Sequence, residues 1–581
     1  MPVLWRSAVL GAGLLAVSAG LPETADATGG LGSNGIKHVL LISIDGMHAV
    51  DFINCSQGIS GVNNGAPYCP NLARLADTGI NYLETSTSKP SDSFPGLMAL
   101  VSGGSPRTVG AFYDVAYDRV LAPPAQTTGN GLAAGPCIPF QPNGTTTEYE
   151  EGIDKDQSKL NGGAPDGLDG GIASIDPKRL IRDPFNGCKP VYPWNFVRTN
   201  TIFGVVHQAG GYTAWSDKHP SYSSVAGPGD GSNVNDYYSP EINSNVVPLP
   251  GVPAVPLPGL TSCDPIPDPT NTGSWTDSFD NIKCYDSLKV QAILNEINGW
   301  DHTGKKRRPV PSLFGMNFQV VSVGQKLIEK SIGMKGGYLD NEGRPTDELL
   351  GEIQFADAAI GQMVGGLQNR GLYQSTLIVI SAKHGQSPID SQRYLGIGVP
   401  SGSPITTSPA MILDALLPLS ERPSNSPPGI GPTEDDISLL WLADASKTTS
   451  AVQTLESTSP ATSNVAGIGE IFSGPGIAQM FNPPGLPPYG DPRTPDIIVQ
   501  PNIGVTYSGS TKKLAEHGGF SHDDTNVVML LSNPGFSPAT VTSPVATVQI
   551  APTILAELGL DPQQLQAVQI QGTQVLPGLG F

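Results

Sequence analysis

The run His38-Val39-Leu40-Leu41-Ile42-Ser43-Ile44, followed directly by Asp45-Gly46, decides the class of fold. A nearly continuous apolar run of this length is typical of a parallel strand that is buried on both faces. Two later runs, 376–381 (TLIVIS) and 527–532 (VVMLLS), have the same character and are also bounded by turn residues. Together they predict three buried strands of one open sheet.

Amphipathic helices accompany these strands. Apolar residues recur at three- to four-residue spacing over about 345–370, and the stretches around 285–298 and 546–559 carry the same pattern. Helices that alternate with buried strands predict an α/β fold, with a central, mostly parallel sheet and helices on both faces. We expect a single domain over residues 28–581, with insertions at about 115–280 and 395–480.

The composition is poor in charge and rich in turn-forming residues. Charged residues make up 14% of the 581 positions, whereas Gly and Pro number 70 and 55. Typical soluble domains carry roughly 25% charged residues. Much of the Gly and Pro lies between 115 and 280, where Tyr, Trp and Cys are also scattered. We interpret these stretches as ordered loops, with disorder as the alternative.

Residues 1–27 have the features of a secretory signal peptide. Arg6 supplies a positive start, residues 8–20 are largely apolar, and Ala25-Asp26-Ala27 offers a cleavage site between small residues. A membrane anchor is the alternative, but the apolar run is shorter than the ~20 residues that span a bilayer. We therefore expect a secreted, extracellular protein without a stable membrane anchor.

Six cysteines agree with an oxidising compartment, and their spacing matches no zinc ribbon or finger. Six cysteines allow 15 pairings. We favour the sequential pairs 55–69, 137–188 and 263–284, which close short loops in the irregular regions. The sequons at Asn54 and Asn143 predict glycan acceptors only if the host glycosylates, and Asn54 adjoins an expected disulfide.

The net charge of −20 argues against nucleic acid or an anionic membrane as the main partner. It also means that an anionic small molecule would not be attracted by the protein as a whole. Any phosphate site must therefore create its own local positive field.

Polar residues stand where two of the expected strands end. Asp45 follows the first strand, and Lys383-His384-Gly385 follows the run at 376–381; His517-Gly518-Gly519 precedes the run at 527–532. Ligands of open α/β sheets bind beyond the carboxyl ends of the strands. A carboxylate directly after a buried strand needs a partner. Asp45 is therefore a candidate ligand or partner in a site, with a turn or helix cap as the alternative.

Ser93 lies in the segment Pro90-Ser91-Asp92-Ser93-Phe94-Pro95-Gly96, which leads into the apolar helical stretch 97–101. The start of a helix offers free backbone N–H groups and a favourable dipole to a phosphate group. A serine at this place is either a nucleophile or simply the residue that caps the helix, and caps are far more common.

The order of short motifs resembles the alkaline phosphatase superfamily, and within it the type I phosphodiesterase/nucleotide pyrophosphatase family. The similar segments run over about 38–125, 310–390 and 490–581. Ser91 to Pro95 (SDSFP) is similar to the nucleophile turn of that family, which puts Ser93 at the nucleophile. The other segments that carry the resemblance are Pro70-Asn71-Leu72, 103–110 (GGSPRTVG), 493–499 (RTPDIIV), His517-Gly518-Gly519 and 550–555 (IAPTIL).

The resemblance implies a fold of that superfamily and a site with two zinc-type ions. Asp45, His384 and Ser93 correspond to ligands of one ion, and His517 corresponds to a ligand of the other. Three further ligand positions depart from the family: they hold Val321, Gln325 and Lys383. Asp114 stands where the family has a phosphate-contacting asparagine. We therefore expect a divalent metal, with zinc favoured, and one ion rather than two.

Lys383 leaves two interpretations open: it replaces a metal ion as the fixed positive charge beside the phosphate, or the site has lost both metals and catalysis. The group Ser216-Asp217-Lys218-His219 predicts either phosphate contacts through Lys218 and His219 or a solvated turn. The carboxylates that follow His522 are read as a helix cap and loop, although a part in the site stays open.

Three functions are compatible with these residues. The first is a secreted hydrolase of small phosphoester substrates, in which Ser93 forms a phosphoseryl intermediate and Lys383 and His517 assist. The second is a catalytically silent member of the fold that binds an anion. The third, a sulfatase or phosphotransferase, is disfavoured because a sulfatase turn needs an arginine that is absent after Ser91.

Overall fold

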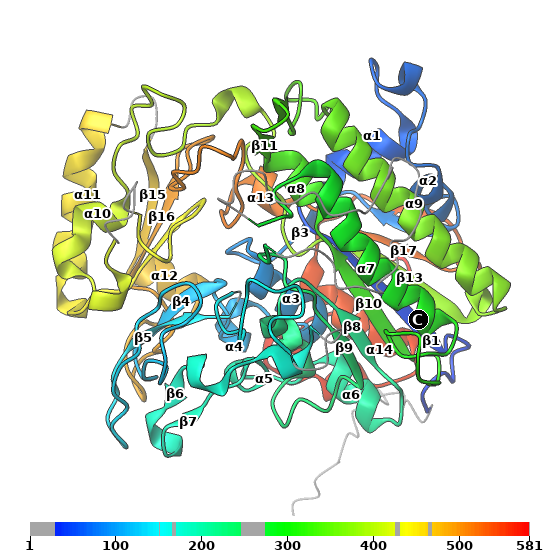
Figure 1. Cartoon of the computed structure of the whole chain (residues 1–581), viewed down its shortest axis with the longest axis horizontal. Helices are drawn as coiled ribbons and strands as arrows, with labels where there is room; N and C mark the ends of the chain where they lie inside the picture. Colours follow the sequence, from blue (N-terminus) through cyan, green and yellow to red (C-terminus); the bar gives the residue numbers. More distant parts are fainter. Residues whose placement is uncertain are drawn as a thin grey trace, which may run out of the picture.

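Strand β1 (His38–Ile44) lies inside an eight-stranded sheet with the order β18-β2-β17-β13-β1-β10-β8-β9 (Figure 1). The computed structural model describes residues 30–149, 151–164, 170–245, 274–423, 430–462 and 467–579. The expected signal peptide lies outside this part. The other strands of the sheet are β2 (Gly79–Tyr82), β8 (Ala214–Ser216), β9 (Asp236–Tyr238), β10 (Leu313–Phe318), β13 (Thr376–Ser381), β17 (Leu530–Ser532) and β18 (Ala539–Val541).

The side chains of β1 alternate between two hydrophobic cores. Val39 and Leu41 join the core beneath one face, whereas Leu40, Ile42 and Ile44 join the core beneath the other. Every one of these side chains is fully buried, which explains why the strand is apolar throughout. The sequence analysis predicted this arrangement, and the sheet confirms the expected α/β fold.

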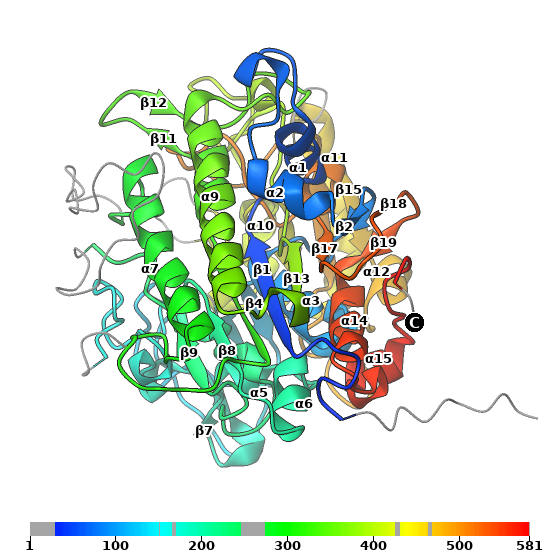
Figure 2. The ribbon, with the colours of Figure 1, turned by 90° about the vertical axis from the view of Figure 1, so that its right-hand side faces the viewer.

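Helices cover both faces of the sheet, as Figure 2 shows from the side. The helices on one face are α1 (Ala49–Gln57), α2 (Pro70–Ala76), α7 (Phe279–Ile297), α8 (Val320–Lys326) and α9 (Asp347–Asn369). The helices on the other face are α3 (Ser93–Ser102), α6 (Ile202–Gln208) and α14 (Ile550–Glu557). The three amphipathic stretches of the sequence thus form α9, α7 and α14, although α7 begins earlier and α14 is shorter than expected.

The apolar run 527–532 corrects one expectation. Only its last part forms a strand, β17, and this strand pairs antiparallel with both β13 and β2. The backbone N–H groups of Val527 and Val528 donate instead to the carbonyls of Thr85 and Met47. The remaining pairings of the sheet are parallel, so the sheet is mostly parallel.

The two regions expected as insertions are built differently. The first contains β8 and β9, which extend the central sheet beyond β10. The second packs beside the sheet, on the left in Figure 1, around a core of its own. It contributes β14 (Ser438–Leu440) and β15 (Ile468–Ser473), which flank β16 (Ile497–Pro501), together with α10 (Pro409–Leu413) and α11 (Thr448–Thr462).

Two of the three expected disulfides are present, Cys55–Cys69 and Cys137–Cys188. Cys263 of the third expected pair lies outside the described residues. Asn54 is buried and its amide nitrogen donates to the carbonyls of Glu342 and Gly343, whereas Asn143 is exposed. None of the helices in the described ranges is both long and apolar enough to cross a bilayer.

Candidate active site

Four parallel strands bring the residues that follow them to one edge of the sheet. Because β13, β1, β10 and β8 are neighbours and run in the same direction, their carboxyl ends lie side by side. The polar residues that gather there are Asp45, Asp217, Lys218, Gln319, Lys383 and His384. Together with Ser93, five of them form a buried group that we name the Ser93 cluster: Asp45, Ser93, Asp217, Lys218, Lys383 and His384.

Ser93 is the first residue of α3, and Asp92 holds the N-cap position before it. Ser93 is therefore not the cap of its helix, which was the competing interpretation of the sequence. Gly96, one turn later, faces the backbone of Lys383, where a Cβ would collide with the carbonyl oxygen. The glycine thus allows α3 to approach the end of β13 and brings Ser93 beside His384.

The hydroxyl of Ser93 has two nitrogen partners. Its Oγ lies 3.1 Å from His384 Nε2 and accepts a hydrogen bond of 3.0 Å from Lys218 Nζ. The other ring nitrogen of His384, Nδ1, lies 2.7 Å from the carbonyl oxygen of Gly385 and must donate to it. Nε2 consequently carries the lone pair and is the acceptor for the Ser93 proton.

Lys383 joins the carboxylates of the cluster. Its Nζ donates to Asp217 Oδ1 at 2.8 Å and lies 4.0 Å from Asp45 Oδ2. The same Asp45 oxygen accepts from Asn317 Nδ2 at 3.1 Å and from Gln319 Nε2 at 2.7 Å. Burial raises the pKa of Asp45, but Lys383 and His384 outweigh it and hold that pKa well below the usual range. Asp45 is therefore a buried, ionised carboxylate.

His517 lies beside His384, with ring centroids 3.9 Å apart. Its Nδ1 is 3.3 Å from Asp92 Oδ1 but lacks the alignment of a hydrogen bond. Burial lowers the pKa of His384, and burial together with the charges of Lys326 and Lys218 lowers the pKa of His517 well below its usual value. Both rings are therefore neutral at neutral pH and can accept a proton.

Asp114 occupies the N-terminus of α3. Its Oδ1 accepts the Phe94 N–H at 2.6 Å, and its Oδ2 accepts from the Tyr222 hydroxyl at 3.2 Å. The next residue, Pro95, has no N–H, and the Gly96 N–H bonds the Asp92 carbonyl. The expectation that this helix start offers several free N–H groups to a phosphate is thus corrected, because a carboxylate of the chain already takes one of them.

His219, the neighbour of Lys218, pairs with a carboxylate outside the Ser93 cluster. Its Nδ1 lies 2.9 Å from Glu241 Oε1, and both side chains are buried. The structure thus brings Lys218 to Ser93 and His219 to Glu241. Among the carboxylates that follow His522, Asp524 is buried next to Asp436 behind the site, and burial raises its pKa to about 6.

Gln325 belongs to a second buried group, which we name the Gln325 cluster: His48, Asp51, Gln325 and Tyr338. Gln325 Nε2 donates to the Gly46 carbonyl at 2.7 Å and to the Tyr338 hydroxyl at 2.8 Å. The Tyr338 hydroxyl donates to Asp51 at 2.8 Å, and Asp51 also accepts from the His48 backbone N–H at 2.9 Å. Neighbouring Val321 is apolar and fully buried.

The donor set does not fit a divalent ion. One oxygen of Asp45, Oδ1, is buried without a hydrogen-bond partner, which is the kind of atom that a metal would need. Two ammonium groups, however, lie nearby: Lys218 Nζ donates to Ser93 Oγ, and Lys383 Nζ lies 4.0 Å from the other oxygen of Asp45, so a cation bound here would be repelled by two positive charges. Within the described ranges, no three His, Cys, Asp or Glu side chains are grouped to hold a metal.

Three side chains of the site were not predicted from the sequence: Asn317, Gln319 and Tyr222. Asn317 and Gln319 flank the end of β10, so the rule that placed Asp45 at the end of β1 could have found them. Tyr222 had no such signal. Its ring lies 4.0 Å from Lys383 Nζ, and this contact depends on how the segment after β8 folds back.

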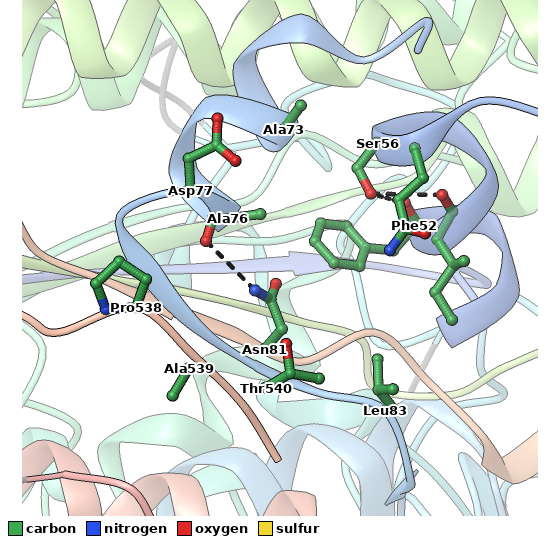
Figure 3. A pocket seen from close by; sticks show the side chains of 12 residues that line it. Phe52, Ser56, Ala73, Ala76, Asp77, Asn81, Leu83, Pro538, Ala539 and Thr540 are labelled. Atoms are coloured by element: carbon green, nitrogen blue, oxygen red, sulfur yellow. Dashed lines mark hydrogen bonds between the residues drawn. The ribbon is translucent and has the colours of Figure 1, made fainter. Parts of the chain in front are cut away.

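Ser93 itself is fully buried, and His517 and Lys218 beside it are only 7% and 5% exposed. A cavity of about 460 Å³ lies elsewhere, between α1, α2 and β18 (Figure 3). Asp77 is its only titratable lining residue, so nothing there resembles a catalytic group. A second cavity of about 400 Å³, lined by Asp436 and the segment 520–523, lies behind the loop that follows Lys383.

Comparisons with known proteins agree with this geometry. Residues 39–141 match the family model of type I phosphodiesterase / nucleotide pyrophosphatase. Wild-type alkaline phosphatase PafA is similar in structure, with a TM-score of 0.52 at 12% identity over 90% of this chain and 96% of that one. Murine ectonucleotide pyrophosphatase / phosphodiesterase 5 covers 94% and 97% of the two chains at 13% identity, with a TM-score of 0.47. No curated protein matches the sequence significantly.

Proposed function

We propose that the chain, which matches the type I phosphodiesterase / nucleotide pyrophosphatase family model over residues 39–141 and is similar in fold to alkaline phosphatase PafA, hydrolyses small phosphoesters with Ser93 as nucleophile. The observation that carries the proposal is the pair of nitrogens on Ser93 Oγ. One of them, His384 Nε2, can take the proton, and the other, Lys218 Nζ, stabilises the oxygen that loses it. A serine needs this kind of activation before it becomes nucleophilic.

The proposed reaction has two steps. In the first, His384 Nε2 takes the Ser93 proton while Oγ attacks phosphorus, so that the Oγ–P bond forms and the bond to the leaving oxygen breaks. The leaving oxygen takes up a proton from water, and His384 returns its own proton to solvent. In the second step, His384 deprotonates a water that attacks the phosphorus of the phosphoserine. The Oγ–P bond breaks, the phosphate group leaves, and His384 returns the proton to Ser93 Oγ. Lys218 and Lys383 stabilise the negative charge that grows on the phosphate oxygens.

The other predicted residues take supporting roles. His517 is neutral, lies against His384 and is more exposed than Ser93, so we place it where protons pass between the site and water. Asp45 balances the charge of Lys383 and holds it near Ser93. The disulfides fit an oxidising compartment, which supports secretion, and a small phosphoester is the partner that a buried serine can admit.

A second candidate function, silent anion binding, is favoured by one observation. The carboxylate of Asp114 already occupies the start of α3, and Ser93 is fully buried. In that case the site would bind an anion in place of Asp114 without turning it over.

Ser93→Ala tests the proposal against Ser102→Ala, which removes another buried hydroxyl at the far end of the same helix. Turnover of bis(p-nitrophenyl) phosphate and of p-nitrophenyl phosphate is measured for both variants and the wild type. We expect Ser93→Ala to lose at least about 10³-fold in kcat and Ser102→Ala to keep it, because only Ser93 contacts the base. Equal turnover in wild type and Ser93→Ala refutes the nucleophile, and absence of turnover in the wild type favours silent binding.

A further inference from the structure

Two ammonium groups lie at the carboxyl end of the sheet, one beside the serine and the other beside the carboxylate. Lys218 Nζ donates to Ser93 Oγ at 3.0 Å, and Lys383 Nζ lies 4.0 Å from Asp45 Oδ2. Lys383 is fully buried and Lys218 nearly so, and they come from the ends of two different strands, β13 and β8. Buried lysines are rare unless they are paired or have work to do.

The carboxylates of the cluster are already paired with these lysines. Asp217 accepts from Lys383 Nζ at 2.8 Å, and Asp217 is itself held by the Trp215 indole N–H at 2.9 Å. Asp45 Oδ2 accepts two amide donors, from Asn317 and Gln319. Amide donors thus occupy Oδ2. Oδ1 has no hydrogen-bond partner, but the Lys383 ammonium lies 4.0 Å from the same carboxylate and would repel a cation bound to it.

The space beside Gly46 is also unsuited to a metal ion, but for a different reason. Gln325 donates to the Gly46 carbonyl and is tied to Tyr338 and Asp51. Val321 adds an apolar, fully buried side chain on the same helix, α8. Gln325 Oε1 is the one acceptor of this group without a hydrogen-bond partner, and a single amide oxygen beside an apolar Val321 cannot hold a divalent ion tightly.

We infer that the Ser93 site takes no divalent metal ion and that Lys218 and Lys383 supply the positive charge for phosphate in its place. This inference rests on the proposed function for its chemistry, but the exclusion of the ion rests on the contacts alone. Lys218 donates to the serine oxygen, and Lys383 lies beside Asp45. A phosphate bound at Ser93 would therefore be close to two fixed positive charges. Fixed charges of this kind need no reorganisation when the transition state forms.

The test begins with the intact wild-type protein, purified without chelators. Its zinc, manganese, magnesium and calcium content is measured by mass spectrometry, and Zn²⁺ binding is measured by calorimetry. Lys383→Asp is the positive control, because a carboxylate beside Asp45 and His384 would complete a set of three ligands. We expect less than about 0.1 ion per wild-type chain and one Zn²⁺ in the control variant. One or more tightly held ions per wild-type chain overturns the inference, whether or not the control variant folds.

Hydrolysis of bis(p-nitrophenyl) phosphate before and after chelation is the second measurement. We expect the Ser93-dependent rate to change by less than about twofold with a chelator and to gain nothing from added Zn²⁺, and Lys218→Met to lose about 10²-fold or more. Activity that disappears with the chelator and returns with Zn²⁺ overturns the inference and leaves Ser93 as nucleophile. Absence of Ser93-dependent hydrolysis under every condition refutes the proposed function, while the ion content still decides the question of metal.

Discussion

The Ser93 cluster and the Gln325 cluster lie on either side of the Asp45-Gly46 turn, and both are buried, yet they are built on opposite principles. The Gln325 cluster is a compact hydrogen-bond network in which a tyrosine, a glutamine and a histidine converge on one carboxylate, Asp51. The Ser93 cluster collects two ammonium groups, two carboxylates and a neutral imidazole around a hydroxyl.

Unpaired buried atoms do not separate the two groups, because Asp45 Oδ1 and His517 Nδ1 lack a hydrogen-bond partner on one side and Gln325 Oε1 lacks one on the other. The partners of the central groups do separate them. The Ser93 hydroxyl contacts an ammonium group and an imidazole that can take its proton, whereas Asp51 is tied to Tyr338 and Gln325. We infer that the Gln325 cluster supports the fold and the Ser93 cluster carries the chemistry, and variants in each can separate the two roles.

His384→Gln is expected to have the largest effect. Glutamine still accepts a hydrogen bond from Ser93 but cannot take its proton, so kcat should fall by about 10²- to 10⁴-fold, the usual contribution of a general base. Melting temperature, followed by circular dichroism, should move by only a few degrees because the change is nearly isosteric. Gln325→Met is the matched control in the other cluster and should keep its kcat. Full turnover by His384→Gln would show that the Ser93 proton leaves by another route.

Several residues of the Ser93 cluster could be predicted from the sequence, because they directly follow recognisable strands. A continuous apolar run such as 38–44 is typical of a strand that is buried on both faces. The residue after it therefore lies at the carboxyl end of the sheet. Asp45, Lys383 and His384 were predicted in this way, whereas Ser93 was placed at the nucleophile because Ser91 to Pro95 (SDSFP) is similar to the nucleophile turn of the phosphodiesterase family. The direction of β17 could not be predicted, because an apolar run does not show whether the strand pairs parallel or antiparallel with the strands beside it.

The contacts across large sequence separations could not be predicted. Lys218 reaches Ser93 from 125 residues away. His219, the next residue, turns to Glu241. A sequence shows that the two side chains are adjacent, but which of them faces the site depends on the alternation of the strand ending at Ser216 and on the helical turn that follows. Likewise, the sequence shows that residue 114 is an aspartate where the resembled family has an asparagine. Only the fold shows that its carboxylate accepts a hydrogen bond at the start of α3.

Tyr338→Phe is expected to have a smaller effect, on stability alone. Burial and the charge of Asp51 raise the pKa of Tyr338 well above its usual range, so its hydroxyl keeps the proton that it donates to Asp51. Removal of this donor should lower the free energy of unfolding by about 1–3 kcal/mol, measured in urea, with kcat unchanged.

Tyr507→Phe is the control for that experiment, since its buried hydroxyl has no hydrogen-bond partner in the described part of the chain. It should change the free energy of unfolding by less than about 0.5 kcal/mol. A loss of turnover in Tyr338→Phe that exceeds its loss of stability would show that the Gln325 cluster reaches into the reaction, and would end the division between the two groups.

Asp114→Asn is expected to have the smallest effect, and the opposite sign. The carboxylate of Asp114 lies on the first N–H groups of α3, where it repels an approaching phosphate and competes for the Phe94 N–H. An amide keeps an oxygen for Phe94, removes the negative charge and can donate to phosphate. We expect KM for p-nitrophenyl phosphate to fall by up to about tenfold. Two unit charges about 4 Å apart repel each other by a few kcal/mol at most, and removal of the Asp114 charge relieves part of this repulsion of the phosphate. Asp77→Asn, which removes a charge at the remote cavity of Figure 3, should leave KM unchanged. An unchanged KM in Asp114→Asn would place the phosphate away from α3, and the Ser93 cluster would then owe its anion affinity to Lys218 and Lys383 alone.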